Sequence, residues 1–203
     1  MIGERLGEIV ESGTRQFVAE ASELHRAPAF GSLVCVCQSD RPTIMGMTFD
    51  VTTGSLDTGR RPLARGRAPD RYDERIYDAF PELRETLRTQ FSLLVVGYRD
   101  GTRPYQYSLP PQPVPLHYSV CACTPDEQYA FTASFDYFHT VIEARDVPAD
   151  ELLVASIRHA AALRGLGMEP YLLRAGQSLA RLLRDDYDRL VAMLRRIAPA
   201  EVQ

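Results

Sequence analysis

The feature that most constrains the fold is a pair of short apolar segments joined by a turn, within residues 29–54. Residues 33–37 and 44–51 are rich in β-branched and small apolar side chains, and the Ser-Asp-Arg-Pro sequence between them is typical of a turn. Gly31 admits the chain to the first segment. Gly46, inside the second, indicates a bend or bulge of the kind that small barrels use at corners. The pattern predicts a β-hairpin.

Further strands are expected on both sides of this hairpin. Residues 6–12 and 16–21 flank a Gly-Thr turn and alternate in polarity, which predicts a first hairpin with one buried face. Residues 92–98 form a short apolar run that ends at a turn. The prolines of residues 110–115 cannot donate to a strand ladder, so this segment is expected to be extended before residues 116–123 form the last strand. Six strands are predicted.

An insertion at residues 52–90 interrupts these strands. Residues 52–70 lose all periodicity and predict an irregular loop, whereas residues 78–90 carry a proline near the start and apolar residues at helical spacing. We therefore expect one barrel domain over residues 1–124, with a loop and a helix inserted into it.

Residues 125–203 are expected to be helical. A short helix begins after Thr124, residues 131–143 are ambiguous between helix and strand, and residues 146–163 form a helix with acids in its first turn. A last helix is predicted over residues 169–197. Its apolar stripe comprises Leu172, Gly176, Leu179, Leu183, Tyr187, Leu190, Leu194 and Ile197. The fold class is α+β: a six-stranded antiparallel β-barrel with a helical insertion, followed by a helical hairpin.

Composition excludes several functions. The 203-residue chain has a net charge of -4, and all 23 of its basic residues are arginine. Without lysine there is no phosphate loop of the Walker A type and no Schiff base on a lysine amine. The negative charge argues against a protein that coats nucleic acid generally. No apolar run approaches the roughly 20 residues of a membrane span, so a soluble, cytoplasmic protein without a membrane partner is expected.

The strands resemble the HAS-barrel. The resemblance rests on GEIVES and GTRQFVAEA, on FGSLVCV and IMGMTFDV, and on LPPQPVPLHYSV, and it covers residues 7–124 apart from the insertion. This small barrel stands at the N-terminus of HerA-type DNA-translocating ATPases and of F-type ATP synthase subunits, where it forms rings and docks partners. The resemblance implies an assembly role. It does not extend to ATP hydrolysis, because residues 125–203 contain no phosphate loop.

Two Cys-x-Cys pairs lie on predicted strands: Cys35 with Cys37, and Cys121 with Cys123. Alternation places both thiols of a pair on one face, so four sulfurs could hold zinc if the strands were neighbours. Structural zinc sites, however, usually take cysteines from turns, and a straight strand separates such thiols by about 7 Å. We expect buried core cysteines, no metal and no cofactor.

The predicted loop is rich in arginine. A flexible loop of this kind could clamp phosphates or an acidic partner through bidentate hydrogen bonds. No aromatic residue is interleaved for base stacking, and a solvated loop offset by the acids of residues 70–74 explains the pattern equally well. The candidate partner- or phosphate-binding residues are Arg60, Arg61, Arg65, Arg67 and Arg71.

No catalytic or metal-binding residue is predicted elsewhere. The four histidines lack metal-ligand spacing, and the acids of residues 185–188 have arginines one turn away, as on a solvated helix face. Ser32 and Ser55 lack the sequence context of an activated nucleophile. The histidines are His25, His117, His139 and His159.

The function expected from the sequence is that of a non-enzymatic assembly or adaptor protein. Its partner would be a further copy of itself or a HerA-like ring ATPase. The alternative is a nucleic-acid-processing factor that contacts phosphates through the arginines of residues 60–71. A nucleic-acid affinity that falls steeply with salt would favour this alternative.

Overall fold

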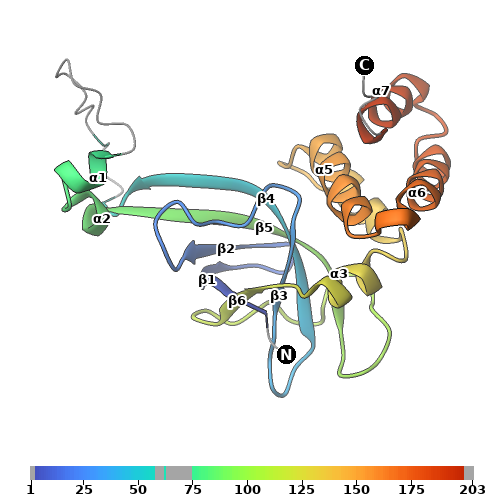
Figure 1. Cartoon of the computed structure of the whole chain (residues 1–203). Coiled ribbons are helices and arrows are strands. Elements are labelled where there is room, and N and C mark those ends of the chain that lie inside the picture. The colour runs from blue at the N-terminus through green and yellow to red at the C-terminus, as the bar shows by residue number, and fades with distance from the viewer. Residues whose placement is uncertain (1–2, 58–61, 63–74, 199–203) are drawn as a thin grey trace, which may run out of the picture.

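The computed structural model describes residues 3–57, 62 and 75–198, which form a closed six-stranded antiparallel barrel followed by helices (Figure 1). The barrel order is β1-β2-β5-β4-β3-β6, so the expected six strands and fold class are confirmed. The strands are β1 (Arg5–Ser12), β2 (Gln16–Ala21), β3 (Leu33–Val36), β4 (Thr43–Ser55), β5 (Leu87–Arg99) and β6 (Ser119–Ala122).

The barrel interior is filled by one face of every strand. Alternate residues of each strand point inward, so the interior forms a single apolar cluster. The register of β4 against β5 shifts between Met45 and Gly46, as the glycine predicted. A Cβ atom at Gly46 would lie 3.1 Å from the ring of Phe17, so the glycine also makes room for this side chain. The interior residues are Ile9, Phe17, Ala19, Val34, Val36, Ile44, Phe91, Leu93, Val95, Val114 and Val120.

A second apolar core lies on the outer face of part of the barrel. Every residue of β3 is buried, because Val34 and Val36 belong to the interior whereas Leu33 and Cys35 belong to the outer core. Met47 of β4 and the buried aromatic rings of the helical region complete this outer core. Strands β3 to β6 therefore lie between the barrel interior and the helices.

Two predicted boundaries in the insertion are wrong. Residues 52–55 belong to β4 and residues 87–90 belong to β5, so the helix expected over residues 78–90 is reduced to α1 (Ile76–Ala79) and α2 (Leu83–Thr86). The apolar spacing that predicted a helix also fits a strand, in which pairing with β4 decides the outcome. The result is a β4–β5 ribbon that extends beyond the barrel to α1 and α2 (Figure 1).

The helical region is built around α5 (Ala149–Ala162), which packs against the other long helices. As predicted, α3 begins after Thr124, whose side chain forms a capping box with Glu127. The ambiguous segment contains α4. The other helices are α3 (Pro125–Phe131), α4 (Tyr137–Ile142), a 3₁₀ turn (Gly165–Gly167), α6 (Met168–Leu182) and α7 (Tyr187–Ile197). Among the described residues, no helix combines the length and the apolar character that spanning a bilayer requires.

The barrel and α5 approach closely at Gly31. This glycine has a φ of +80°, and a Cβ atom there would lie 2.5 Å from the Cβ of Ala155 in α5. The backbone N–H of Gly31 donates to the carbonyl oxygen of Thr48 in β4 (2.8 Å), which fixes the segment to the barrel. Gly31 therefore admits the chain to β3, as expected, and also allows α5 to pack directly on it.

The long terminal helix predicted over residues 169–197 is two helices. The chain turns at residues 183–186, and the Asp186 carboxylate accepts a hydrogen bond from the N–H of Arg189 (3.2 Å) as the N-cap of α7. A residue with a short side chain that accepts a hydrogen bond, such as Asp186, can mark the end of one helix and the start of the next. The apolar spacing is uniform across this break and therefore does not reveal it. The hairpin expected of two helices is thus a bundle in which α6 and α7 both pack on α5.

Candidate functional site

An apolar groove of about 500 Å³ runs between α6 and α7. Only Glu169 and Gln177 are polar among the described residues that line it. In Figure 1 α5 lies between the barrel and these two helices, so the groove belongs to the part of the bundle farthest from the barrel. Its lining comprises Glu169, Leu172, Leu173, Gly176, Gln177, Ala180, Leu194, Ile197 and Ala198.

Small residues on α6 create the groove. A Cβ atom at Gly176 would lie 3.1 Å from the Leu194 Cδ2 atom, so this glycine allows α7 to approach. Ala180 lies one turn further along the same face of α6. Leu173, one turn before Gly176, is 65% exposed and projects beside this shallow stretch. The surface thus combines a protruding leucine with an adjacent hollow.

The predicted apolar stripe divides between two environments. Its buried members are Leu179, Leu183, Leu190 and Ile197. Leu172 and Leu194 are half-buried in the groove, and Tyr187 is 73% exposed. Part of the stripe therefore covers the bundle, as expected, and part of it remains at the surface.

The Cys-x-Cys pairs lie on neighbouring strands, with Cys35 directly opposite Cys121. The expected separation of about 7 Å within a pair is wrong for the first pair, because the Sγ atoms of Cys35 and Cys37 are 4.0 Å apart. Cys37 lies directly after β3, which ends at Val36. Cys123 likewise follows the end of β6.

These sulfurs gather near an acidic side chain. The Sγ atoms of Cys35 and Cys123 and a carboxylate oxygen of Glu127 all lie within 4.8 Å of one another. The pKa of Cys35 is raised by its contact with Cys123 and by burial, and burial also raises the pKa of Cys37 to about 11. Burial raises the pKa of Cys121 as well. Cys35, Cys37 and Cys121 are therefore thiols at neutral pH.

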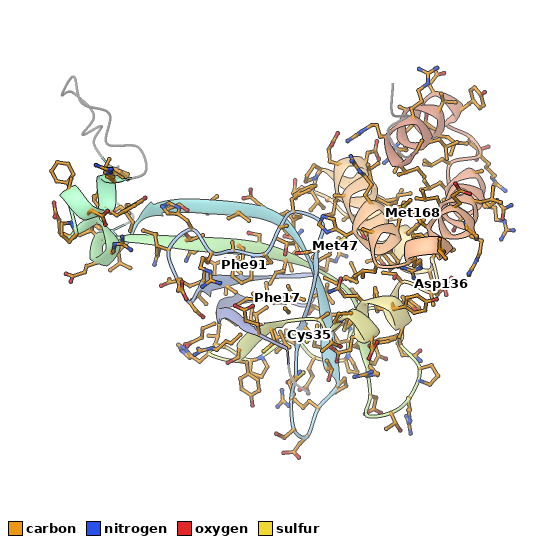
Figure 2. The ribbon with its side chains drawn as sticks, in the orientation of Figure 1. Phe17, Cys35, Met47, Phe91, Asp136 and Met168 are labelled. Carbon is orange, nitrogen blue, oxygen red and sulfur yellow. The ribbon has the colours of Figure 1, made fainter. Side chains whose placement is uncertain are left out.

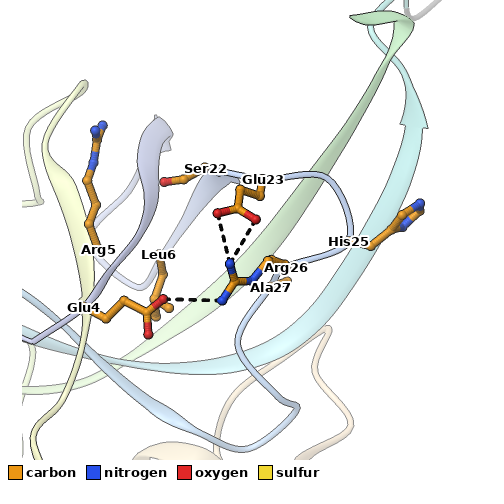
Figure 3. A pocket seen from close by; sticks show the side chains of 8 residues that line it. All are labelled: Glu4, Arg5, Leu6, Ser22, Glu23, His25, Arg26 and Ala27. Atoms are coloured by element: carbon orange, nitrogen blue, oxygen red, sulfur yellow. Dashed lines mark hydrogen bonds and ion pairs between the residues drawn. The ribbon is translucent and has the colours of Figure 1, made fainter. Parts of the chain in front are cut away.

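A polar pocket of about 350 Å³ lies beside β1 and the segment after β2 (Figure 3). Arg26 Nη1 donates to both carboxylate oxygens of Glu23 (3.0 and 2.9 Å), and Arg26 Nη2 lies 3.7 Å from Glu4. These hydrogen bonds and charges raise the pKa of Arg26 further. Since the carboxylates of Glu4 and Glu23 compensate the guanidiniums of Arg5 and Arg26, the pocket offers little net positive charge to an anionic ligand.

A wider cleft of about 900 Å³ lies between the β1–β2 turn and the loop before α5. Its charged lining consists of Arg15, Glu143, Arg145 and Asp146, all exposed to solvent. No serine, cysteine or histidine belongs to the described lining.

The arginine-rich loop does not contribute to the described structure. Arg60, Arg61, Arg65, Arg67 and Arg71 all lie outside the described residues. Their predicted binding role therefore stays a prediction.

Two of the four histidines contact a neighbouring side chain. His117 Nδ1 lies 2.8 Å from a Glu8 carboxylate oxygen, and His25 Nε2 contacts the hydroxyl of Tyr77. Burial lowers the pKa of His159. Within the part of the chain that the structure describes, the group of Cys35, Cys123 and Glu127 is the only one in which three possible metal ligands come together.

Two features therefore remain as candidates for binding: the groove between α6 and α7, and the sulfur cluster where β3 and β6 end. The sequence indicates the cysteines of the cluster and the groove residues Leu172, Gly176, Leu194 and Ile197. It does not indicate Leu173, Ala180 or Glu127 as site residues. The signals that could have helped were the small residues at 176 and 180, and the turn residues after Cys37. No protein-family model matches this chain, and no curated protein matches it.

Proposed function

We propose that the protein is a non-enzymatic assembly module that associates with a second copy of itself through the groove between α6 and α7. The observation that carries the proposal is the apolar lining of this groove on an outward face of the bundle. Contiguous apolar surface of this kind marks interaction sites on proteins that are otherwise polar outside.

The shape of the groove favours a second copy. Leu173 projects beside a hollow lined by Ala180 and by Leu194, which packs over Gly176, so the same face carries both a protruding side chain and a depression. A two-fold axis across α6 would place Leu173 of each copy in the hollow of the other, which is the self-complementarity that an isologous dimer needs. Helices meet in this way when small residues let their axes approach. A stable interface would bury roughly 800 Å² on each copy.

The barrel supports the same assembly role. The HAS-barrel that the strands resemble forms rings and docks partners in HerA-type and F-type ATPases. A HerA-like ring ATPase is thus the second occupant to test. Because the barrel is closed, its strands offer few free edges, and the terminal helices are the better contact surface.

The test is the mass of the protein in solution. We expect light scattering after size exclusion to give a dimer whose fraction rises with concentration over a roughly hundredfold range. Leu173→Glu should yield a monomer, because the variant would bury an unpaired charge at the interface. Leu56→Glu is the matched control: Leu56 is 54% exposed at the far end of the β4–β5 ribbon, and its replacement should leave the dimer intact.

A wild-type monomer across the whole range would overturn self-association. Equal loss of the dimer in both variants would show that the groove is not the interface. If the wild type is monomeric but retains a purified HerA-type ATPase in a manner that Leu173→Glu abolishes, the groove serves that partner instead.

A further inference from the structure

Two thiols and one carboxylate converge where β3 and β6 end and α3 begins, and a third thiol lies beside one of them. Cys35 lies on the outer face of the barrel on the side of α3 (Figure 2). Cys37 follows the end of β3, Cys123 follows the end of β6, and Glu127 is in the first turn of α3. Residues from three separate elements are thus brought to one place.

The distances suit a single small ion. Cys35 Sγ lies 4.0 Å from Cys37 Sγ, and the Sγ atoms of Cys35 and Cys123 lie within 4.8 Å of each other and of a Glu127 oxygen. Zn–S bonds of about 2.3 Å in a tetrahedron place neighbouring sulfurs about 3.8 Å apart. The ligand atoms of Cys35, Cys123 and Glu127 are thus near the spacing that one zinc ion requires, and Cys37 is the neighbouring thiol that could supply a fourth ligand.

Glu127 is already fixed in position. Its Oε2 atom accepts hydrogen bonds from the backbone N–H of Thr124 (2.9 Å) and from the Thr124 hydroxyl (3.0 Å). This capping box also holds the first turn of α3 against the end of β6. A ligand whose orientation is set by a second hydrogen bond is typical of metal sites.

The surrounding charge also fits a cation bound by anionic ligands. Arg99 Nη2 lies 3.6 Å from Glu127 Oε1, and the Arg99 Nε atom is buried without a hydrogen-bond partner. A divalent ion with the thiolates of Cys35, Cys37 and Cys123 and the carboxylate of Glu127 carries a net charge of about -2. The Arg99 guanidinium would balance half of this charge in a site whose Cys35 and Cys123 are buried.

We propose that Cys35, Cys123 and Glu127 bind a zinc ion, with Cys37 as the fourth ligand. The thiolate-rich donor set selects a thiophilic metal such as zinc over magnesium or calcium, which prefer oxygen ligands. Four protein ligands leave no open position, so the site is structural and not catalytic. The bound ion would link the ends of β3 and β6 to α3.

Binding requires that the thiols lose their protons to solvent. Each thiolate formed on zinc releases one proton, and no electron is transferred. Because zinc binds the thiolate form, the affinity should rise with pH and the protein should acidify a weakly buffered solution as zinc is added.

Cobalt(II) provides the spectroscopic test. We expect the reduced, metal-free protein to bind about one cobalt ion per chain, with the near-ultraviolet thiolate-to-metal absorption and visible bands of a tetrahedral site. One equivalent of zinc should abolish these bands. Cys35→Ser and Cys123→Ser should lose them, and Glu127→Gln, which can keep the capping box, should weaken binding at least tenfold.

Cys121→Ser is the matched control, because Cys121 is also buried on β6 but does not belong to the ligand group. It should keep the cobalt spectrum. An absent spectrum in the wild type, or one lost equally in Cys121→Ser, overturns the proposal. If the ligand variants fail to fold, mass spectrometry of wild-type protein alkylated with and without zinc decides: zinc should protect the half-buried Cys37 from alkylation, and unchanged labelling of Cys37 contradicts the site.

Discussion

Gly31→Ala should destabilise the protein strongly, because Gly31 lies where the barrel touches α5. The glycine has a φ of +80°, at which an L-residue costs about 1–2 kcal/mol. The added methyl group would lie 2.5 Å from the Cβ of Ala155 and 3.0 Å from the N atom of Ser156. Overpacking of this kind costs about 1–3 kcal/mol. We expect a loss of about 2–5 kcal/mol in the free energy of unfolding.

Gly101→Ala separates the two contributions. Gly101 has a φ of +59° but no atom within 4 Å of the added Cβ position. Both variants lose the same freedom in the unfolded chain, so that effect cancels in the comparison. The difference between their unfolding free energies therefore measures the contact with α5 alone.

Equilibrium unfolding in urea provides the measurement, with the m-value as a check that both variants unfold in the same way. Gly31→Ala should be less stable than Gly101→Ala by about 1–3 kcal/mol. A difference below about 0.5 kcal/mol would refute the reasoning, because the segment before β3 would then not be pressed against α5.

Two further outcomes follow from the side-chain contacts. A double-mutant cycle on Arg189→Ala and Asp150→Ala should give a coupling of about 1 kcal/mol, because the pair is bidentate but about one third exposed; additive effects would exclude a link between α7 and α5. Burial raises the pKa of Cys37 from 9.0 to about 11, so the unfolded chain loses this proton first as the pH rises. The urea concentration at the midpoint of unfolding should therefore fall between pH 9 and pH 11, and it should fall less in Cys37→Ala. An equal pH dependence in the two proteins would contradict burial of Cys37 as the cause.

The barrel could be predicted because its strands alternate or are uniformly apolar and are bounded by turns. The β1–β2 hairpin and the β3–β4 hairpin have the boundaries that their sequences indicate, within a few residues. The helix predicted over residues 87–90 is wrong because their apolar spacing fits the period of a strand as well as that of a helix. Only the pairing of β5 with β4, which is a non-local contact, distinguishes the two.

The candidate sites were harder to predict because both depend on where an element stops. Because α6 ends at Leu182 and α7 begins at Tyr187, the two helices can pack side by side with a groove between them. One continuous helix would have no such groove. Likewise, the thiols of Cys35 and Cys37 meet at the point where β3 ends. Boundaries of this kind depend on capping and on tertiary contacts, which periodicity does not encode.

Strand β3 lacks the alternation that usually selects one pairing with its neighbours. Because Leu33–Val36 is apolar on both faces, a slip by one residue would still bury apolar side chains inside and outside the barrel. Hydrophobic burial alone therefore distinguishes poorly between the native arrangement and a slipped one. A slip would turn Cys35 toward the barrel interior and away from Cys123 and Glu127. A metal ion bound by Cys35, Cys123 and Glu127 would therefore stabilise only the native register of β3 during folding.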